Sequence, residues 1–373
     1  MPIRAIPSTM AGVQLSGHGG LEMLHYRTDL SVPRPKATEV LIKVGASAVN
    51  NTDINTRIGW YSKKVKAETN AGGAEGFETV DDQDASWSGV PLVFPRIQGA
   101  DCCGEIVAVG EQVDPSRIGE RVLVRTIQQP FDTRGEYHCI TYGSECDGGF
   151  AEYAIARASE AFAINSQLTA AELACFPCAY STAENMLERA QVKAGEQVLI
   201  TGASGGVGSA AVQLAKRRGA RVIAVCGIDK QAALLALGAD QVIARGESLV
   251  AALGKDSVQV VIDLVAGPQW PQCGELLCRG GRYAVAGAIA GPLVALDVRT
   301  LYLKDLSFLG CTWQPKRVMH NLVHYIEQGE IRPLVAKTYP LSAITTAQQD
   351  FLAKNFIGKI VLLPSREQSH ENH

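Results

Sequence analysis

The chain has 373 residues, of which 46% are hydrophobic and 20% charged, so it can bury a large core, and its length favours two domains over one. The formal net charge of −3 and the sequence pI of about 6.2 give no electrostatic reason for nucleic acid or an anionic membrane as a partner. No apolar run reaches the roughly 20 residues of a membrane span and no signal-peptide core is recognisable, so we expect a cytoplasmic protein. Ten cysteines spread through apolar segments suit reduced thiols better than disulfides.

Short β-rich runs separated by turns fill the first part of the chain. Strands are predicted at residues 39–44, 104–109, 121–125 and 151–156. With little helix between them, they predict a compact β-rich domain. From about Thr169 the pattern changes to Ala-rich stretches of helical character at residues 170–178 and 182–190.

Strands and helices alternate regularly in the part that follows. Strands are predicted at residues 197–201, 221–226, 241–243, 258–263 and 282–286. A helix over residues 208–218, apolar on one face, joins the first two strands, which predicts right-handed βαβ units and a buried parallel sheet. Beyond Gly287 we expect a helix around residues 319–328 and a strand at residues 359–363, and we assign this tail to the first domain.

A glycine-rich turn joins the first of these strands to its helix. Residues 198–208 read Val-Leu-Ile-Thr-Gly-Ala-Ser-Gly-Gly-Val-Gly, with Ala203, Gly205 and Gly208 at the three fingerprint positions of a dinucleotide-binding turn. Such a turn lets the backbone approach a pyrophosphate, which the free N–H groups at the helix N-terminus then bind. The alternative is that these glycines serve only a steric purpose, as glycines can in any tight turn between a strand and a helix. The strand before this turn and the amphipathic helix after it favour the dinucleotide interpretation.

The end of the second strand indicates which nicotinamide cofactor is preferred. An acidic residue there would accept from the ribose 2′-OH of NAD, but this chain has Cys226 and Gly227. The first carboxylate is that of Asp229, beyond the strand, and Lys230 and Arg245 could neutralise a 2′-phosphate. We therefore expect NADPH. The alternative is that both cations are only solvated surface groups.

Several motifs together resemble one family over nearly the whole chain. They are Ala-Ser-Gly-Gly-Val-Gly at 203–208, Ala-Val-Asn-Asn-Thr-Asp-Ile-Asn-Thr-Arg-Ile-Gly-Trp-Tyr at 48–61, Gly-Ala-Asp-Cys-Cys-Gly-Glu-Ile-Val-Ala-Val-Gly at 99–110, Gly-Gly-Phe-Ala-Glu-Tyr at 148–153 and Gly-Lys-Ile-Val-Leu at 358–362. The chain resembles the medium-chain dehydrogenase/reductase superfamily and, within it, the zinc-independent quinone oxidoreductase-like branch.

The resemblance implies an α/β fold in which a Rossmann doubly wound parallel sheet is inserted in a GroES-like β-rich catalytic domain. We expect the catalytic domain at residues 1–165 plus 312–373, the Rossmann NADP(H)-binding domain at 166–311, and an inserted loop at 62–94. The expected cofactor-binding residues are Thr182, Ala203, Ser204, Gly205, Gly206, Val207, Gly208, Cys226, Gly227, Lys230, Arg245, Gly287 and Lys359.

A catalytic zinc needs about three protein ligands from Cys, His and Asp or Glu. The ligand positions of the superfamily's zinc alcohol dehydrogenases correspond by motif to Asn50, Ala100 and Cys178, of which only Cys178 could bind metal, and Asp101 would leave the set one ligand short. A structural zinc lobe needs four close cysteines, whereas the corresponding region offers Cys139 and Cys146, with His138 nearby. We expect no metal.

Without a Lewis acid, hydride delivery to an electron-poor conjugated carbonyl needs less help than alcohol oxidation. We therefore expect reduction of quinones or α,β-unsaturated carbonyls. The catalytic candidates are Asn50, Asp53, Arg57 and Tyr61, with Tyr61 as the first choice of proton donor. The alternatives are that Asp53 and Arg57 form a structural ion pair and that Tyr61 only packs. Ser181 and Thr182 match a helix start that the family places against the nicotinamide, although an N-cap role would explain them equally well.

The segment 62–94 is longer than the loop of related proteins and carries glycines and, around Trp87, the acidic residues Asp81, Asp82 and Asp84. We expect an ordered but mobile lid that shapes the substrate pocket; the alternative is a plain surface loop.

The segment 296–311 resembles the family's last Rossmann strand, which pairs across a two-fold axis, so we expect a homodimer. Two other functions compete with the reductase: an NADPH-binding, crystallin-like protein with little catalysis, and a zinc-containing alcohol dehydrogenase.

Overall fold

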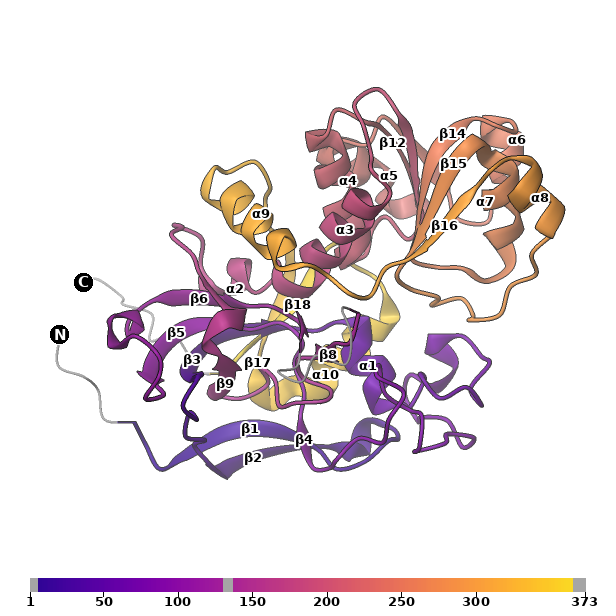
Figure 1. Cartoon of the computed structure of the whole chain (residues 1–373). Coiled ribbons are helices and arrows are strands. Elements are labelled where there is room, and N and C mark those ends of the chain that lie inside the picture. Colours follow the sequence, from indigo (N-terminus) through magenta and orange to yellow (C-terminus); the bar gives the residue numbers. More distant parts are fainter. Residues whose placement is uncertain (1–5, 130–136, 365–373) are drawn as a thin grey trace.

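The computed structural model describes residues 6–129 and 137–364, which form two bodies that lie side by side. In Figure 1 one body is built mainly from the first part of the chain and the other from the middle part, while the C-terminal strands return to the first body. Within these described residues, no helix is both long and apolar enough to cross a membrane.

The second body contains a parallel sheet of six strands in the order β13-β12-β11-β14-β15-β16. The strands are β11 (Gln197–Ile200), β12 (Arg221–Cys226), β13 (Gln241–Ala244), β14 (Val258–Asp263), β15 (Leu277–Val285) and β16 (Ser307–Gly310). Helices lie on both faces: α3 (Pro177–Arg189), α4 (Gly206–Arg217), α5 (Gln231–Leu237), α6 (Leu249–Leu253), α7 (Trp270–Leu276) and α8 (Val298–Leu303). In β11, Val198 and Ile200 join one hydrophobic core and Leu199 the other, as expected for a strand buried on both faces.

The first body contains a seven-stranded sheet, with the path β10-β6-β5-β3-β18-β17 and β9 paired to β3. Its strands are β3 (Glu39–Ala48), β5 (Cys103–Val109), β6 (Arg121–Val124), β9 (Tyr153–Arg157), β10 (Ala161–Ala163), β17 (Val335–Pro340) and β18 (Lys359–Leu363). Smaller sheets are formed by β1 (Thr9–Leu15), β2 (Leu24–Ser31) and β4 (Arg96–Ile97), and by β7 (Ile127–Gln128) and β8 (Ile140–Thr141). The α/β fold with a Rossmann sheet and a GroES-like β-rich part is thus confirmed.

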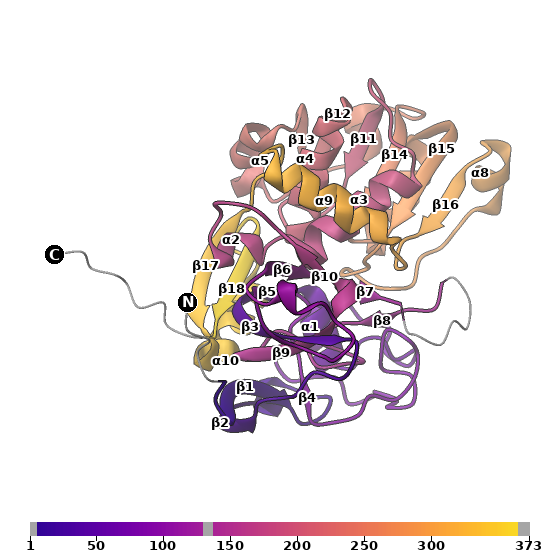
Figure 2. The same cartoon turned by 60° about the vertical axis from the view of Figure 1, so that its left-hand side comes forward.

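The C-terminal tail closes the first body, as Figure 2 shows for β17 and β18 beside β3. Val361 of β18 pairs antiparallel with Ala48 of β3, so chain segments more than 300 residues apart share one sheet. The remaining helices are α1 (Asn51–Arg57), α2 (Ala170–Leu173), α9 (Lys316–Glu327) and α10 (Ile344–Ala353), with 3-10 turns η1 (Leu21–Met23), η2 (Thr69–Gly72), η3 (Pro115–Arg117), η4 (Ala158–Glu160), η5 (Ile228–Lys230), η6 (Gly267–Gln269) and η7 (Leu341–Ala343).

Two expectations about helices and strands need correction. The helical stretch expected at residues 170–178 is interrupted, because α2 ends at Leu173 and α3 begins at Pro177, which has no N–H to continue a preceding helix. The strand expected at 282–286 begins five residues earlier, at Leu277. Helix α2, at the start of the expected Rossmann domain, packs against β3 and β18 of the first body. The domain limits 1–165, 166–311 and 312–373 stay predictions.

Candidate active site

The dinucleotide turn connects β11 to α4 and packs tightly on itself. Gly202 adopts φ +59°, and a Cβ on Gly208 would lie 2.3 Å from the Gly202 carbonyl oxygen, so both positions require glycine. No side chain caps the N-terminus of α4 at Gly205, which leaves its first N–H groups free for an anion. With Ala203 buried beneath the turn, this backbone fits a pyrophosphate.

A buried carboxylate supports the turn from below. The Thr201 hydroxyl donates to Asp263 Oδ1 at 2.5 Å, and the Tyr283 hydroxyl donates to Asp263 Oδ2 at 2.5 Å. Gly287 lies beside these residues, since a Cβ there would be 2.9 Å from the Leu264 carbonyl oxygen. Asp263 was not predicted because its two side-chain partners, Thr201 after β11 and Tyr283 in β15, are far from it in the sequence.

Lysines gather at the end of β12, where cofactor preference is decided. Lys230 Nζ donates to the backbone carbonyl of Lys354, and Lys354 Nζ donates to Asn51 Oδ1 at 3.1 Å. Burial, followed by the charge of Lys230, lowers the pKa of Lys354 to about 7. Among the residues described, neither ammonium group forms an ion pair with a carboxylate.

The other residues expected to bind the cofactor at the end of β12 are Cys226, Gly227 and Arg245, and the structure shows fewer groups there that could bind a phosphate. Cys226 is buried, and its backbone carbonyl accepts from the Arg245 backbone N–H at 2.7 Å. The Arg245 side chain is exposed. The Asp229 carboxylate lies over Gly227, with Oδ1 2.7 Å from where a Cβ would be. Lys354 was not predicted, because nothing in its local sequence marks a lysine that follows α10 as a neighbour of η5.

A buried charged centre lies between the two bodies. Lys359 Nζ is 2.9 Å from Asp101 Oδ2 and also donates to Asn50 Oδ1. Asn50 Nδ2 donates to Asp101 Oδ2 at 2.7 Å, and the backbone N–H of Cys178 donates to Asp101 Oδ1 at 2.7 Å. Burial alone would lower the pKa of Lys359, but the Asp101 charge holds it above its ordinary value. Lys359 is therefore a buried ammonium ion.

Lys359 also supports the nucleotide turn. A Cβ on Gly206 would lie 2.7 Å from Lys359 Cδ, and the backbone N–H of Gly358 donates to the Ser204 carbonyl oxygen at 3.2 Å. The structure thus places Lys359 under the turn, with its ammonium group directed to Asp101 and Asn50. Direct contact between this residue and the cofactor stays a prediction.

Asp53 and Arg57, both expected to be catalytic, have structural partners. Asp53 accepts the backbone N–H of Asn50 at 2.8 Å and that of Ala100 at 3.2 Å, and burial raises its pKa to about 7. Arg57 is buried and donates to Gln348 Oε1 at 2.9 Å and to two backbone carbonyls, those of Gly19 and Gly73. The considered ion pair between the two is not formed.

Tyr61 lies in an aromatic group with a threonine. Its hydroxyl donates to Thr52 Oγ1 at 3.2 Å, and Trp87 Nε1 donates to the same atom at 2.5 Å. The Tyr61 and Trp87 rings are 5.2 Å apart, and burial raises the pKa of Tyr61 well above its ordinary value. Thr52 stands two residues after Asn50, inside the motif that the sequence analysis singled out, but only the fold shows that two donors converge on it.

Ser181 and Thr182 lie inside α3, whose N-cap is Phe176. The Thr182 hydroxyl donates to the Cys178 carbonyl at 2.8 Å and that of Ser181 to the same oxygen at 3.3 Å. The alternative N-cap role is therefore wrong, because the helix begins four residues before Ser181.

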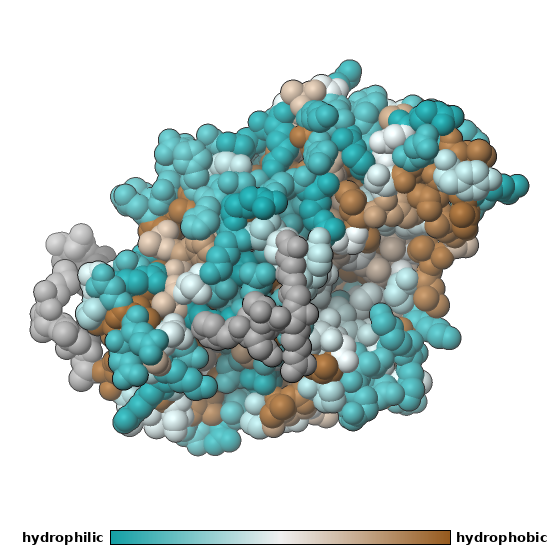
Figure 3. All heavy atoms as spheres, in the orientation of Figure 1, coloured by the Kyte–Doolittle hydropathy of each residue, from teal (hydrophilic) through white to brown (hydrophobic). Residues whose placement is uncertain are grey.

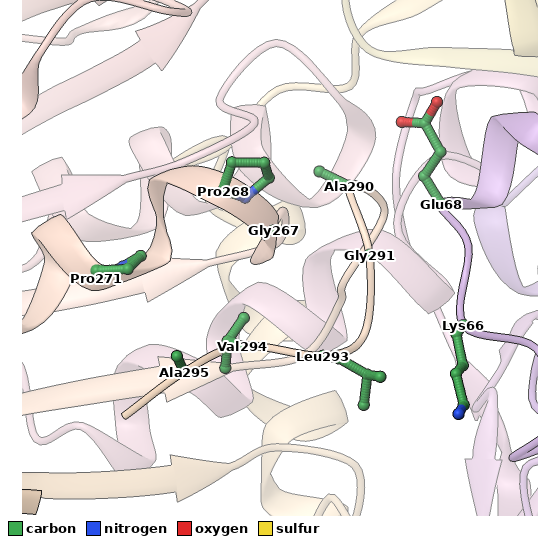
Figure 4. Close-up of a pocket in the computed structure, with 10 residues that line it drawn as sticks. All are labelled: Lys66, Glu68, Gly267, Pro268, Pro271, Ala290, Gly291, Leu293, Val294 and Ala295. Carbon is green, nitrogen blue, oxygen red and sulfur yellow. The ribbon is translucent and has the colours of Figure 1, made fainter. Parts of the chain in front are cut away.

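The insertion 62–94 is held at both bodies. Ser88 N–H donates to Glu145 Oε1 of the first body at 3.1 Å, and Thr69 N–H donates to the Ile289 carbonyl of the second body at 3.2 Å. Beside this contact is a cavity of about 400 Å³, where Figure 4 shows Lys66 and Glu68 facing the segment that carries Ala290 and Leu293. The insertion therefore forms one wall at the junction between the bodies.

A nucleotide-binding sheet, a β-rich body and a buried polar centre between them define an oxidoreductase that binds a dinucleotide. The alcohol dehydrogenase GroES-like domain model matches residues 36–166, and the zinc-binding dehydrogenase model matches residues 206–328. Quinone oxidoreductase from Lama guanicoe is 30% identical over 95% of this chain and 97% of its own length. Acryloyl-coenzyme A reductase from Metallosphaera sedula is 29% identical over 95% of this chain and 99% of its own.

A solved structure from Sinorhizobium meliloti 1021, described as that of a candidate alcohol dehydrogenase, is 47% identical with a TM-score of 0.85, covering 97% of this chain and 98% of that chain. The chain therefore belongs to the medium-chain dehydrogenase/reductase superfamily and is quinone oxidoreductase-like within it.

The zinc that one family model's name implies does not fit the residues present. Ala100 has no ligand atom, and the oxygens of Asp101 already accept from Lys359, Asn50 and the Cys178 backbone. Burial raises the pKa of the Cys178 thiol, which opposes the thiolate that zinc requires. Across residues 6–129 and 137–364, no three His, Cys, Asp or Glu side chains, Cys139 and Cys146 included, are grouped to hold a metal ion.

The placement of Arg57 leads to a stability prediction. Replacing Arg57 by Met removes the donor of three acceptors, so we expect the free energy of unfolding to fall by about 3–5 kcal/mol, measured by urea denaturation. Arg27→Met, which removes an exposed pair with Asp29, is the matched control and should change little. Unchanged stability with lost turnover would instead make Arg57 catalytic.

Proposed function

We propose that this protein transfers hydride from NADPH to a quinone or an α,β-unsaturated carbonyl compound without using zinc. The observation that carries the proposal is the centre of Asn50, Asp101 and Lys359, whose hydrogen bonds and charge occupy the place where a metal would need ligands. The names of the quinone oxidoreductase and acryloyl-coenzyme A reductase relatives support the substrate class. A 25% identical structure with a TM-score of 0.79 is of a 2-octenoyl-CoA carboxylase reductase in complex with NADP and 2-octenoyl-CoA.

In the proposed reaction, some residues of the chain bind the cofactor and others stabilise the carbonyl oxygen of the substrate. The free N–H groups at the start of α4 bind the pyrophosphate, and a bound reduced nicotinamide supplies the hydride. A conjugated carbonyl accepts hydride at its β-carbon while negative charge develops on its oxygen, which a hydroxyl donor can stabilise. Asn50 has both amide atoms in use, and Tyr61 donates its proton to Thr52, which leaves the Thr52 hydroxyl as the donor best placed for this oxygen.

Oxidation of NADPH with a panel of quinones and enones tests the proposed function. We expect turnover with at least one class, less than about 0.1 zinc per chain by elemental analysis, and no loss of rate after EDTA treatment, because the part of the chain that the structure describes holds no ligand set. NADPH binding without turnover would favour the crystallin-like alternative. Stoichiometric zinc with chelator-sensitive alcohol oxidation would favour the alcohol dehydrogenase.

NADPH preference is supported by the two lysines at the end of β12. Lys230 and Lys354 place two ammonium groups near each other, and like charges held together in a partly buried site favour an anion between them. The cofactor's phosphates are anions of this kind. We therefore extend the expected set of Lys230 and Arg245 by Lys354.

The lowered pKa of Lys354 predicts pH-dependent cofactor binding. A phosphate favours the protonated amine, so its pKa should rise from about 7 on binding, and NADPH affinity should fall as pH rises from 6.5 to 8.5, by up to about tenfold per unit. Fluorescence titration should show this slope in the wild type, a flat and weaker response in Lys354→Met, and little effect in Lys255→Met, whose side chain pairs with Glu275 on the surface. Lys230→Met should weaken NADPH more than NADH. A slope that survives in Lys354→Met would contradict the assignment.

A homodimer is proposed from the edge of the Rossmann sheet. β16 is the last strand of that sheet, and side chains such as those of Val298, Tyr302 and Leu303 are more than half exposed beside it. Figure 3 shows hydrophobic atoms gathered where Figure 1 places α8. A second copy pairing along β16 would cover both the edge strand and these exposed side chains. The cytoplasmic location of the protein stays a prediction.

Light scattering after size-exclusion chromatography tests the dimer. We expect twice the 39.8 kDa chain mass for the wild type and the single-chain mass for Val298→Asp with Leu303→Asp, since buried charges oppose association. Ile118→Asp alters an exposed apolar residue on the first body and should remain dimeric. A wild type of single-chain mass would refute the proposal.

A further inference from the structure

One hydroxyl in the insertion-lined part of the site receives two hydrogen bonds. Thr52 lies in the first turn of α1, two residues after Asn50 of the buried centre. Its Oγ1 accepts from Trp87 Nε1 at 2.5 Å and from the Tyr61 hydroxyl at 3.2 Å. Trp87 belongs to the 62–94 insertion, whereas Thr52 and Tyr61 belong to the motif before it.

This geometry determines what the Thr52 hydroxyl can still do. A hydroxyl has one proton and two acceptor lone pairs, and an indole N–H can only donate. With both acceptor positions filled, Thr52 is left with its own proton, which no acceptor among residues 6–129 and 137–364 receives in the structure. Two donors on one oxygen also polarise that hydroxyl, since hydrogen bonds in a chain strengthen one another.

The position of Trp87 is fixed by the insertion around it. Ser88 donates from its backbone N–H and its hydroxyl to Glu145 Oε1, at 3.1 and 3.0 Å, and the preceding residues Ala85 and Ser86 are buried. The ring centroid of Tyr61 lies 5.2 Å from that of Trp87 and 5.8 Å from that of Trp60, so Tyr61 packs against both tryptophans. These contacts hold Trp87 in place as part of a wall, while the mobility expected of the insertion stays a prediction.

We propose that Trp87 is a positioning residue which turns Thr52 into a hydrogen-bond donor for the carbonyl oxygen of the substrate. The inference rests on the proposed reduction of conjugated carbonyls, where negative charge develops on that oxygen. Thr52 would contact the substrate, and Trp87 would act only through Thr52. The insertion thereby contributes one indole N–H to the reaction.

Matched tryptophan variants test the role of that N–H. Trp87→Phe keeps an aromatic ring against Tyr61 but loses the donor, and we expect kcat for an enone to fall about tenfold with the KM for NADPH unchanged. Trp60→Phe is the control, because its N–H donates to the Ala67 carbonyl at 3.0 Å, and should stay within about twofold. Thr52→Val should lose about 100-fold and Thr52→Ser should restore most of the rate. Adding Trp87→Phe to Thr52→Val should cause no further loss.

An indole ¹⁵N–¹H spectrum reports on the contact without any turnover. The Trp87 signal, assigned by its loss in Trp87→Phe, should move in Thr52→Val and stay in Thr52→Ser, while the Trp60 signal should not respond. A Trp87 signal indifferent to Thr52→Val, or equal kcat losses in the two tryptophan variants, overturns the inference even in an active enzyme. A wild type that reduces no quinone or enone, with the indole contact intact, overturns the proposed function and the role of Thr52 together.

Discussion

The buried ion pair between Lys359 and Asp101 is the interaction on which the two bodies depend. Each partner is at most 3% exposed, so removing either one would leave an unpaired charge in a low-dielectric interior, at a penalty of several kcal/mol. Asp101 lies between β4 and β5 of the β-rich body, and Lys359 is the first residue of β18. The pair is satisfied only when the C-terminal tail has returned to β3.

The same pair sets the geometry on both sides of it. Asp101 receives the N–H of Cys178 at the start of α3, the helix that packs on α4 behind the nucleotide turn. Lys359 lies beneath Gly206, the first residue of α4. One carboxylate and one ammonium group therefore connect the β-rich body, the C-terminal strand and the anion-binding end of α4, which explains why neither charge is available to a metal or a solvent ion.

Local features of this chain could be predicted and tertiary ones could not. The turn at Gly202 and Gly208 is encoded by residues adjacent in sequence, because the close approach and the positive φ both require glycine there. The missing metal ligands at Asn50 and Ala100 could also be inferred from residue type alone. Arg57 is different, since its acceptors come from three distant segments and only the fold shows that it supports structure. Lys354, Asp263 and Thr52 were missed for the same reason: each has a hydrogen-bond partner 20 or more residues away in the sequence.

The ammonium ion of Lys359 in the buried centre bears on the direction of the proposed chemistry. Zinc accepts a lone pair, lowers the pKa of a bound alcohol and so stabilises an alkoxide from which hydride can leave. Lys359 can only donate hydrogen bonds, and its protons are directed to Asp101 and Asn50, so it cannot bind an alkoxide in this way. What remains is neutral donation to an oxygen whose charge is spread by conjugation, a smaller demand that one polarised hydroxyl can meet. The insertion supplies the indole that polarises it, so a segment longer than the family's usual loop and the lysine of the buried centre would act together in one reduction.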